Sequence, residues 1–175
     1  GSLTSEDRYA LAVIGSRRAT QYGRAIAQEF SGQLARWGLT VVSGFARGID
    51  SEGHRGSLDA GGRTIAVLGS GVDVPYPPEN ESLVEEIASR GVVVSEFPLG
   101  TEPYAKNFPA RNRVISGLSL GVIVVEAAQD SGSLITAGFA LEQGRDVFAV
   151  PGNIANESSK GPHKLIKQGA KLVES

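Results

Sequence analysis

The chain has 175 residues, of which 41% are hydrophobic and 21% charged, and its formal net charge is −2. This composition is ordinary for a globular protein, and no stretch approaches the roughly 18 apolar residues that a membrane span requires, which indicates a soluble domain. The charge balance excludes the overall basicity that would by itself indicate a nucleic-acid-binding protein, so any site for a polyanion must be local.

The residue types that are absent or rare exclude several kinds of chemical site. The absence of cysteine excludes disulfides and thiolate metal sites and fits a reducing compartment, so we expect a cytoplasmic protein. His54 and His163 have no metal-binding spacing, and we expect neither a metal nor a cofactor. Gly1 and Ser2 stand where a methionine would begin the chain, which is typical of a cleaved tag, and we expect no secretory leader. Residues 3–175 are therefore expected to form a single domain.

Short apolar runs alternate with longer helix-like segments along the chain. The runs are rich in Val and Ile and continuous, which is typical of parallel strands buried on both faces, and they cover residues 9–15, 39–44, 63–69, 91–97, 121–127 and 145–152. The segments between them have apolar residues at helical spacing and mostly end in glycine, a helix C-cap pattern. These segments cover residues 22–38, 49–62, 80–91, 111–121 and 133–144.

A last amphipathic segment, residues 161–173, predicts a helix and a short terminal strand. The whole alternation predicts an α/β fold, a doubly wound and mostly parallel sheet with helices on both faces and a Rossmann-like architecture. Ligands of such folds bind outside the carboxyl ends of the strands. The loops that follow the predicted strands are therefore where a site is expected.

Gly-Ser turns after the predicted strands are candidate phosphate sites. Turns that lead into a helix offer unpaired N–H groups and the positive end of the helix dipole, and both favour phosphate oxygens. For any single turn we prefer the alternative, in which Gly and Ser only satisfy turn geometry and helix caps. Several such turns at one sheet edge favour an extended anion site. The residues concerned are Gly15, Ser16, Gly44, Gly69, Ser70, Gly71, Ser131, Gly132 and Ser133.

Arginines follow the first predicted strand in the segment GSRRATQYGR. Surface arginines are usually only solvated. At this edge, however, Arg17, Arg18 and Arg24 would point into the crevice, where a guanidinium suits bidentate contact with phosphate.

The region before residue 121 combines an aromatic side chain with cations. One predicted surface loop, stiffened by prolines, holds Lys106, Phe108, Arg111 and Arg113. Single-stranded nucleic acid needs this combination, because bases stack on the ring at about 1–3 kcal/mol each while the charges follow the backbone. In the alternative, Phe108 plugs the base of the loop and Arg111 pairs with a glutamate at a strand end. Arg113, at the expected helix start, is the weakest candidate.

Two nucleotide-binding signatures of enzymes are missing. The chain has no G-x-x-x-x-G-K-[ST] phosphate loop and no G-x-G-x-x-G dinucleotide fingerprint. Two histidines also leave little material for a Ser-His-Asp triad. Of the carboxylates at strand ends, we expect Asp50 to cap a helix and the others to orient arginines, and we expect both histidines to be structural.

Seven motifs resemble the DNA-processing protein A (DprA/Smf) family and run in family order over essentially the whole chain. They are VIGSRRATQYG, VVSGFARGIDSEGH, GGRTIAVLGSGVDVPYPPEN, VVSEFPLG, NFPARNRVISGLSLGVIVVEA, SGSLITAGFALEQGRDVFAVPG and GPHKLIKQGAKLV. The resemblance implies a Rossmann-like core that binds and protects single-stranded DNA and helps to load the recombinase RecA in natural transformation. It implies a protein that is not an enzyme, and flanking helical and winged-helix-like domains that we expect outside these residues.

The resemblance also implies roles for particular residues. Arg17 matches a DNA-contacting arginine, and Phe108 matches an aromatic residue that stacks on a base. Pro78 and Glu79 stand where some members carry a basic residue, which predicts a weaker DNA path there. The implied DNA-binding residues are Gly15, Ser16, Arg17, Arg18, Ser43, Gly44, Lys106, Phe108, Arg111, Asn112, Ser131, Gly132 and Ser133. A homodimer is implied, with interface residues Leu141, Ile166 and Leu172, for which core packing is the alternative.

Two other functions stay open at this point. Nucleoside-monophosphate phosphoribohydrolases of similar architecture bind nucleotides at the same edge, although their P-G-G-x-G-T-x-x-E signature is missing here. A nucleotide-sensing interaction module is the third possibility, and it would bind mononucleotides as tightly as oligonucleotides.

Overall fold

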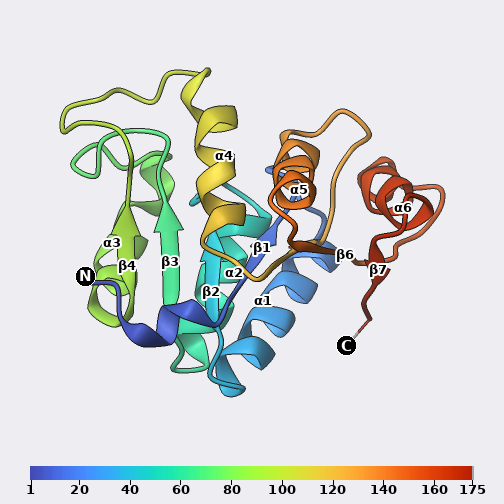
Figure 1. Ribbon diagram of the computed structural model, residues 1–175, viewed down its shortest axis with the longest axis horizontal. Coiled ribbons are helices and arrows are strands. Elements are labelled where there is room, and N and C mark those ends of the chain that lie inside the picture. Colours follow the sequence, from blue (N-terminus) through green and yellow to red (C-terminus); the bar gives the residue numbers. More distant parts are fainter. Residues whose placement is uncertain (175) are drawn as a thin grey trace.

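The sheet is parallel throughout and matches the predicted runs. A computed structural model describes residues 1–174, and within them seven strands pair in the order β4-β3-β2-β1-β5-β6-β7 (Figure 1). The strands are β1 (Ala10–Ile14), β2 (Thr40–Ser43), β3 (Thr64–Val67), β4 (Val92–Val94), β5 (Gly121–Val124), β6 (Asp146–Ala149) and β7 (Lys171–Leu172). All six predicted strands and the short terminal strand are confirmed, as is the Rossmann-like α/β class.

The helices follow the strands in the predicted alternation. They are α1 (Gln21–Arg36), α2 (Ile49–Asp59), α3 (Glu81–Arg90), α4 (Asn107–Gly117), α5 (Gly132–Glu142) and α6 (Lys160–Lys167), with 3₁₀ turns η1 (Ser5–Arg8), η2 (Pro78–Asn80) and η3 (Glu157–Ser159). Thr20 caps α1 by accepting a hydrogen bond from the Gly23 N–H at 3.1 Å. Gly38, after α1, has a φ of 77°, the left-handed conformation that ends a helix without strain. No helix within residues 1–174 is long and apolar enough to cross a membrane.

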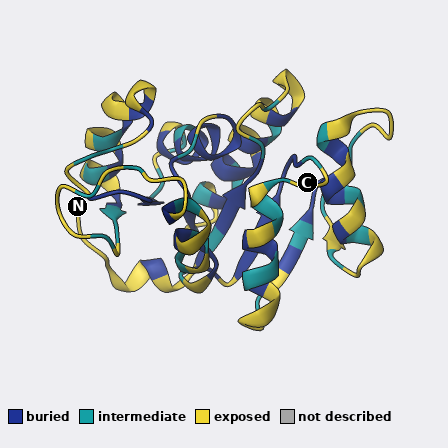
Figure 2. Cartoon of the chain, turned by 90° about the horizontal axis from the view of Figure 1, so that it is seen from above, coloured by how far each residue is buried: buried dark blue, intermediate teal, exposed yellow. Residues whose placement is uncertain are grey.

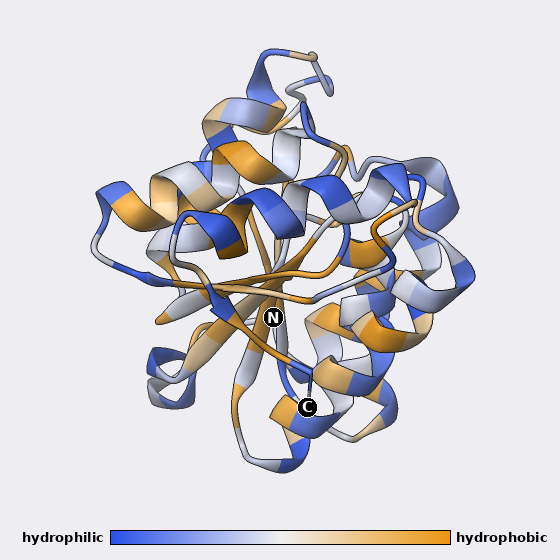
Figure 3. Ribbon diagram, turned by 90° about the vertical axis from the view of Figure 1, so that its right-hand side faces the viewer, coloured by the Kyte–Doolittle hydropathy of each residue, from blue (hydrophilic) through white to orange (hydrophobic). Residues whose placement is uncertain are grey.

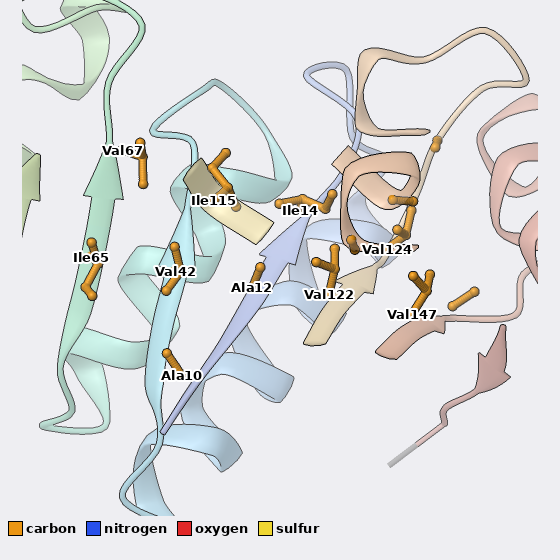
Figure 4. Packing of buried hydrophobic residues seen from close by; sticks show 14 of the residues in the cluster. Ala10, Ala12, Ile14, Val42, Ile65, Val67, Ile115, Val122, Val124 and Val147 are labelled. Atoms are coloured by element: carbon orange, nitrogen blue, oxygen red, sulfur yellow. The ribbon is translucent and has the colours of Figure 1, made fainter. Parts of the chain in front are cut away.

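Helices cover both faces of the sheet. Alternate residues of β1 point to opposite faces. Ile14 therefore packs in one cluster with Ile115 of α4 and Ala137 of α5, whereas Val13 packs in another with Phe30 of α1. A third cluster joins α2 and α3 to the sheet. Figure 4 shows the first cluster along one face of the sheet, and Figure 2 shows buried strands between helices whose outer sides are exposed. The apolar strands also stand out against the hydrophilic outer surfaces of the helices (Figure 3).

The strand order reverses between β1 and β5. From β1 the chain adds β2, β3 and β4 on one side, and β5 then returns to the other side of β1. In Figure 1 the strands point upward, so their following loops gather at the top of the molecule. A crevice at the carboxyl ends of β1 and β5 is the position at which folds of this kind bind ligands.

The predicted loop around Phe108, residues 95–113, is wrong in part, because it is helical from Asn107 onward. Helix α4 begins at Asn107 rather than near Arg111, and Pro109 lies in its first turn. Proline is tolerated there because first-turn N–H groups have no partner within the helix. Residues three and four apart share a helix face, so Phe108, Arg111 and Asn112 lie together, while Arg113 points elsewhere.

Candidate nucleic-acid interface

A cavity of about 650 Å³ lies at the carboxyl ends of β1 and β5, where the strand order reverses. The turns after β1 and β5, the loops after β2 and β3, and the start of α4 all contribute to it. Its lining residues are Ile14, Gly15, Ser16, Arg17, Arg18, Ala46, Asp50, Tyr76, Pro103, Ala105, Phe108, Pro109, Arg111, Asn112, Ile115, Ser131, Gly132, Ser133 and Thr136.

The ring of Phe108 is surrounded by cations and a second aromatic ring. The guanidinium carbons of Arg17 and Arg111 lie 5.3 and 5.9 Å from its centroid, and the Tyr76 ring lies 5.9 Å away at an interplanar angle of 46°. Gly69 lies against the ring so closely that a Cβ there would come within 2.8 Å of Phe108 Cδ1. The ring is half-buried and belongs to none of the three hydrophobic clusters. It is held as a platform at the cavity wall.

Arg111 is buried beneath this platform. Its side chain is only 4% exposed, and Nη1 donates to the carbonyl oxygens of Gly44, at 2.6 Å, and of Val67. Burial lowers the pKa of Arg111 to about 10, so the guanidinium remains charged at neutral pH. Its hydrogen bonds tie α4 to the ends of β2 and β3.

Asp50 is the buried counter-charge of this arginine. Its Oδ2 accepts hydrogen bonds from the Gly44 N–H at 3.1 Å and the Ala46 N–H at 3.3 Å. Burial raises the pKa of the Asp50 carboxyl, while the charge of Arg111 opposes that rise. Asp50 thus orders the loop before α2, whereas Gly48 occupies the N-cap position at which sequence analysis expected an acidic cap.

The turns after β1 and β5 are joined to each other. Ser133 donates from Oγ to the Gly15 carbonyl at 2.8 Å, and Ser131 caps α5 by accepting from the Ser133 N–H at 3.3 Å. Asn112 connects α4 to the same place, because its Nδ2 donates to the Gly132 carbonyl at 3.3 Å. The N-terminus of α5 and the first turn therefore form one rigid wall of the cavity, with the dipole of α5 directed at it.

Most of the predicted DNA-binding residues line the cavity. The ten that do so are Gly15, Ser16, Arg17, Arg18, Phe108, Arg111, Asn112, Ser131, Gly132 and Ser133. Ser43 and Gly44 lie beneath the floor instead, where Ser43 Oγ donates to the Val13 carbonyl at 2.6 Å. Lys106 is exposed and lies outside the lining, directly before α4. The structure thus separates residues that face the cavity from residues that support it.

Two other predicted cations are held by ion pairs away from the cavity. Arg24 donates to Glu52 Oε1 at 3.1 Å, so the expectation that it points into the crevice is wrong. Arg113 donates to both carboxylate oxygens of Glu96, at 2.7 and 2.6 Å. The predicted pairing of a strand-end glutamate with an arginine is therefore realised by Arg113, because α4 turns it away from the cavity that Arg111 enters.

Tyr76 is a further cavity residue that is not among the predicted site residues. It follows β3 in the segment PYPP, lines the cavity and contacts Phe108. The available cue was an aromatic residue in a loop after a strand, at the edge where ligands bind.

The histidines and one serine motif do not form a catalytic arrangement within residues 1–174. His54 is fully buried, with Nδ1 2.7 Å from Thr64 Oγ1, and burial lowers its pKa to about 3. The segment GLSLG, residues 117–121, has the G-x-S-x-G spacing of a nucleophile elbow. It leads from α4 into β5 rather than from a strand into a helix, and buried Ser119 donates to the Ile115 carbonyl at 2.8 Å. Among residues 1–174 no cluster of acidic and histidine side chains could hold a metal ion.

The predicted dimer residues differ in exposure. Leu141 of α5 is 62% exposed and Leu172 of β7 is 50% exposed, whereas Ile166 of α6 is half-buried against the core. Core packing therefore explains the partial burial of Ile166, whereas Leu141 and Leu172 remain at the surface.

Known proteins are similar to this chain in both sequence and fold. The sequence model of the DNA recombination-mediator protein A family matches residues 1–175. The chain is 52% identical over 174 residues to Protein Smf of Escherichia coli, an alignment that covers 99% of this chain and 46% of that protein. The chain spans about half the length of the curated relatives it matches.

Solved structures agree with the sequence comparison. The X-ray structure of DNA processing protein A from Streptococcus pneumoniae matches with a TM-score of 0.92 at 47% identity, over 97% of this chain and 60% of that chain. A structure of DNA processing protein A from Helicobacter pylori, which concerns the single-stranded DNA binding mode of that protein, matches with a TM-score of 0.89 at 31% identity, over 98% of this chain and 80% of that chain. The chain therefore belongs to the DNA recombination-mediator protein A family, the DNA-processing protein A (DprA/Smf) family of the sequence motifs.

Proposed function

We propose that this domain binds single-stranded DNA in the cavity at the β1/β5 edge and is not an enzyme. The observation that carries the proposal is the half-buried Phe108 ring with the Arg17 guanidinium 5.3 Å from its centroid. An aromatic platform beside cations is suited to a base and its phosphate together, and stacking of this kind tolerates any base. The single-stranded DNA binding described for the Helicobacter pylori relative supports the same assignment.

The polar wall of the cavity is suited to the phosphate that follows the stacked base. Arg17 and Arg18 are exposed beside the Gly-Ser turn, and the α5 N-terminus lines the same cavity as Phe108. Guanidinium groups and a helix N-terminus both favour phosphate oxygens. A strand would thus place its base on Phe108 and its backbone along Arg17.

The wider role is proposed for the protein as a whole, because the chain spans only about half the length of its curated relatives. We propose that it protects incoming DNA in the cytoplasm and helps to load the recombinase RecA in transformation, as the family resemblance implies, with residues 3–175 as the DNA-binding domain. The exposed Leu141 and Leu172 support a homodimer that uses α5, α6 and β7. A DNA-dependent increase in RecA filament formation on adding the full-length protein is the expected result, and no increase would remove this part of the proposal.

The DNA-binding proposal is tested by a salt titration of oligonucleotide affinity. Arg17→Ala should weaken binding to all sequences and reduce the log–log salt slope by about 0.7, the value for one single-strand phosphate contact. Arg36→Ala is the control, because Arg36 is exposed in the last turn of α1, far from the carboxyl edge of the sheet. Equal affinity and slope for Arg17→Ala and the wild type would overturn the assignment.

The platform is tested separately from the charge. Phe108→Ala should lower affinity by roughly 5- to 150-fold, which corresponds to about 1–3 kcal/mol for one stacked base, with little change in salt slope. Phe108→Trp should retain binding. If Phe108→Ala also reduced the salt slope as strongly as Arg17→Ala does, stacking would be contradicted. Release of free base from nucleoside monophosphates by the wild type would favour the phosphoribohydrolase alternative.

A further inference from the structure

A second aromatic residue and a second arginine lie beside the Phe108 platform. Tyr76 is 36% exposed, lines the cavity, and has its ring centroid 5.9 Å from that of Phe108. The guanidinium carbon of Arg47, from the loop between β2 and α2, lies 5.7 Å from the Tyr76 centroid. The two rings and their arginines therefore repeat one arrangement: an aromatic face with a cation beside it.

The two arginines differ in their partners. Arg17 forms no ion pair with any carboxylate of residues 1–174. Arg47, in contrast, donates from Nη2 to both carboxylate oxygens of Glu79, at 2.8 and 2.9 Å. The hydrogen bond from Arg47 lowers the pKa of Glu79 below its ordinary value, so this carboxylate is fully charged at neutral pH with or without the shift. The charge of Arg47, the cation beside Tyr76, is thus neutralised by Glu79.

The Arg47–Glu79 ion pair is weak enough for a phosphate to replace Glu79 as the partner of Arg47. The side chains of Arg47 and Glu79 are 46% and 62% exposed, and exposed pairs are weak and screened by salt. A phosphate offers the guanidinium the same bidentate geometry that the carboxylate does. A strand that reaches Arg47 can therefore replace Glu79 without opening the fold.

We propose that Tyr76 stacks on a second base and that Glu79 holds Arg47 until the phosphate of that second nucleotide displaces it. The inference rests on the proposed function, because it continues the strand from Phe108. The two rings are 5.9 Å apart and tilted by 46°, whereas stacked nucleotides rise by about 3.4 Å each with parallel planes. Two neighbouring bases fit only when they are unstacked from each other, as a single strand allows and a duplex does not.

Glu79 then acts as a competitor of DNA and sets the length of strand that binds well. A mononucleotide reaches Phe108 and leaves the Arg47–Glu79 pair intact. A longer strand gains the Tyr76 contact but must break the pair. Salt weakens both the contact of Arg47 with phosphate and the Arg47–Glu79 pair that opposes it. These two effects partly cancel in the salt dependence of DNA affinity.

The test compares thymidine monophosphate with a thymidine octanucleotide on the wild type and Glu79→Gln. Glu79→Gln should bind the octanucleotide about two- to fivefold more tightly, the worth of an exposed ion pair, with a salt slope steeper by up to about 0.7. Binding of the monophosphate should not change. Weaker or equal octanucleotide binding by Glu79→Gln would overturn the proposal.

Matched variants separate this effect from net charge. Asp146→Asn removes the same charge from another exposed pair, with Lys171 at 3.0 Å, at the amino end of β6, and should leave both affinities unchanged. Arg47→Ala in the Glu79→Gln background should abolish the gain. Tyr76→Ala should weaken octanucleotide binding by roughly 5- to 150-fold, and Tyr76→Phe should restore it.

Different results would contradict the second stacking site at Tyr76 and the proposed DNA-binding function. If Arg17→Ala and Phe108→Ala lose binding while Tyr76→Ala and Glu79→Gln match the wild type, the second platform is wrong and the first site stands. If the wild type binds no oligonucleotide, both are wrong.

Discussion

Replacing Arg111 should damage the fold before it damages any contact with DNA. The guanidinium is 4% exposed and donates to the carbonyl oxygens of Gly44 and Val67, with the buried Asp50 as its counter-charge. Arg111→Gln removes the main cation that acts on buried Asp50 and leaves only the weaker effect of Arg17. Removing one member of a buried charge pair costs about 3–5 kcal/mol. Domains are stable by only about 5–15 kcal/mol, so the expected loss is a large part of the total.

Urea unfolding followed by far-ultraviolet circular dichroism measures this loss. The midpoint should fall with little change in the dependence of unfolding free energy on urea, because the same surface is exposed on unfolding. Arg113→Gln is the matched control from the same helix. Its pair with Glu96 is about half exposed on both sides, and its loss should cost less than about 1 kcal/mol.

A double variant sharpens the result. Asp50→Asn with Arg111→Gln removes both charges, so it should be more stable than the sum of the two single losses predicts, by at least about 0.5 kcal/mol. The reasoning is refuted if Arg111→Gln keeps the wild-type urea midpoint but loses DNA affinity and about 0.7 of the salt slope. Arg111 would then contact phosphate, as the family resemblance implied, rather than orient the loops.

The remaining predictions concern pH and assembly. The folded pKa of His54, about 3, lies below its ordinary 6.5, so between these values the unfolded chain binds one more proton and stability falls as pH falls. From pH 6.5 to 5 the loss should be about 2 kcal/mol in urea unfolding, and a slope that persists in His54→Gln would contradict the assignment. For the proposed homodimer, Leu141→Glu should shift the sedimentation equilibrium towards monomer, and an unchanged mass would exclude α5 from the interface.

Local patterns were sufficient for the strands and for most of the helices. Continuous Val- and Ile-rich runs such as residues 121–127 are buried on both faces wherever the sheet forms, so their composition alone marks them. The start of α4 was misplaced because the proline in NFPAR was interpreted as stiffening a loop. Pro109 is equally compatible with a first helical turn. The contact of Phe108 with Gly69 and the hydrogen bonds of Arg111 to the Gly44 and Val67 carbonyls favour that conformation.

Strand periodicity and loop composition are local properties, so they predict the α/β class, the sheet edge of the proposed site and the residue types near it without knowledge of the fold. The environment of each arginine, in contrast, depends on the tertiary fold. Arg111 and Arg113 are two positions apart, yet one is buried against carbonyl groups of β2 and β3 and the other is paired at the surface with Glu96. The partners come from positions up to 67 residues away, and burial and charge pairing depend on which groups the folded chain brings together rather than on neighbours in sequence.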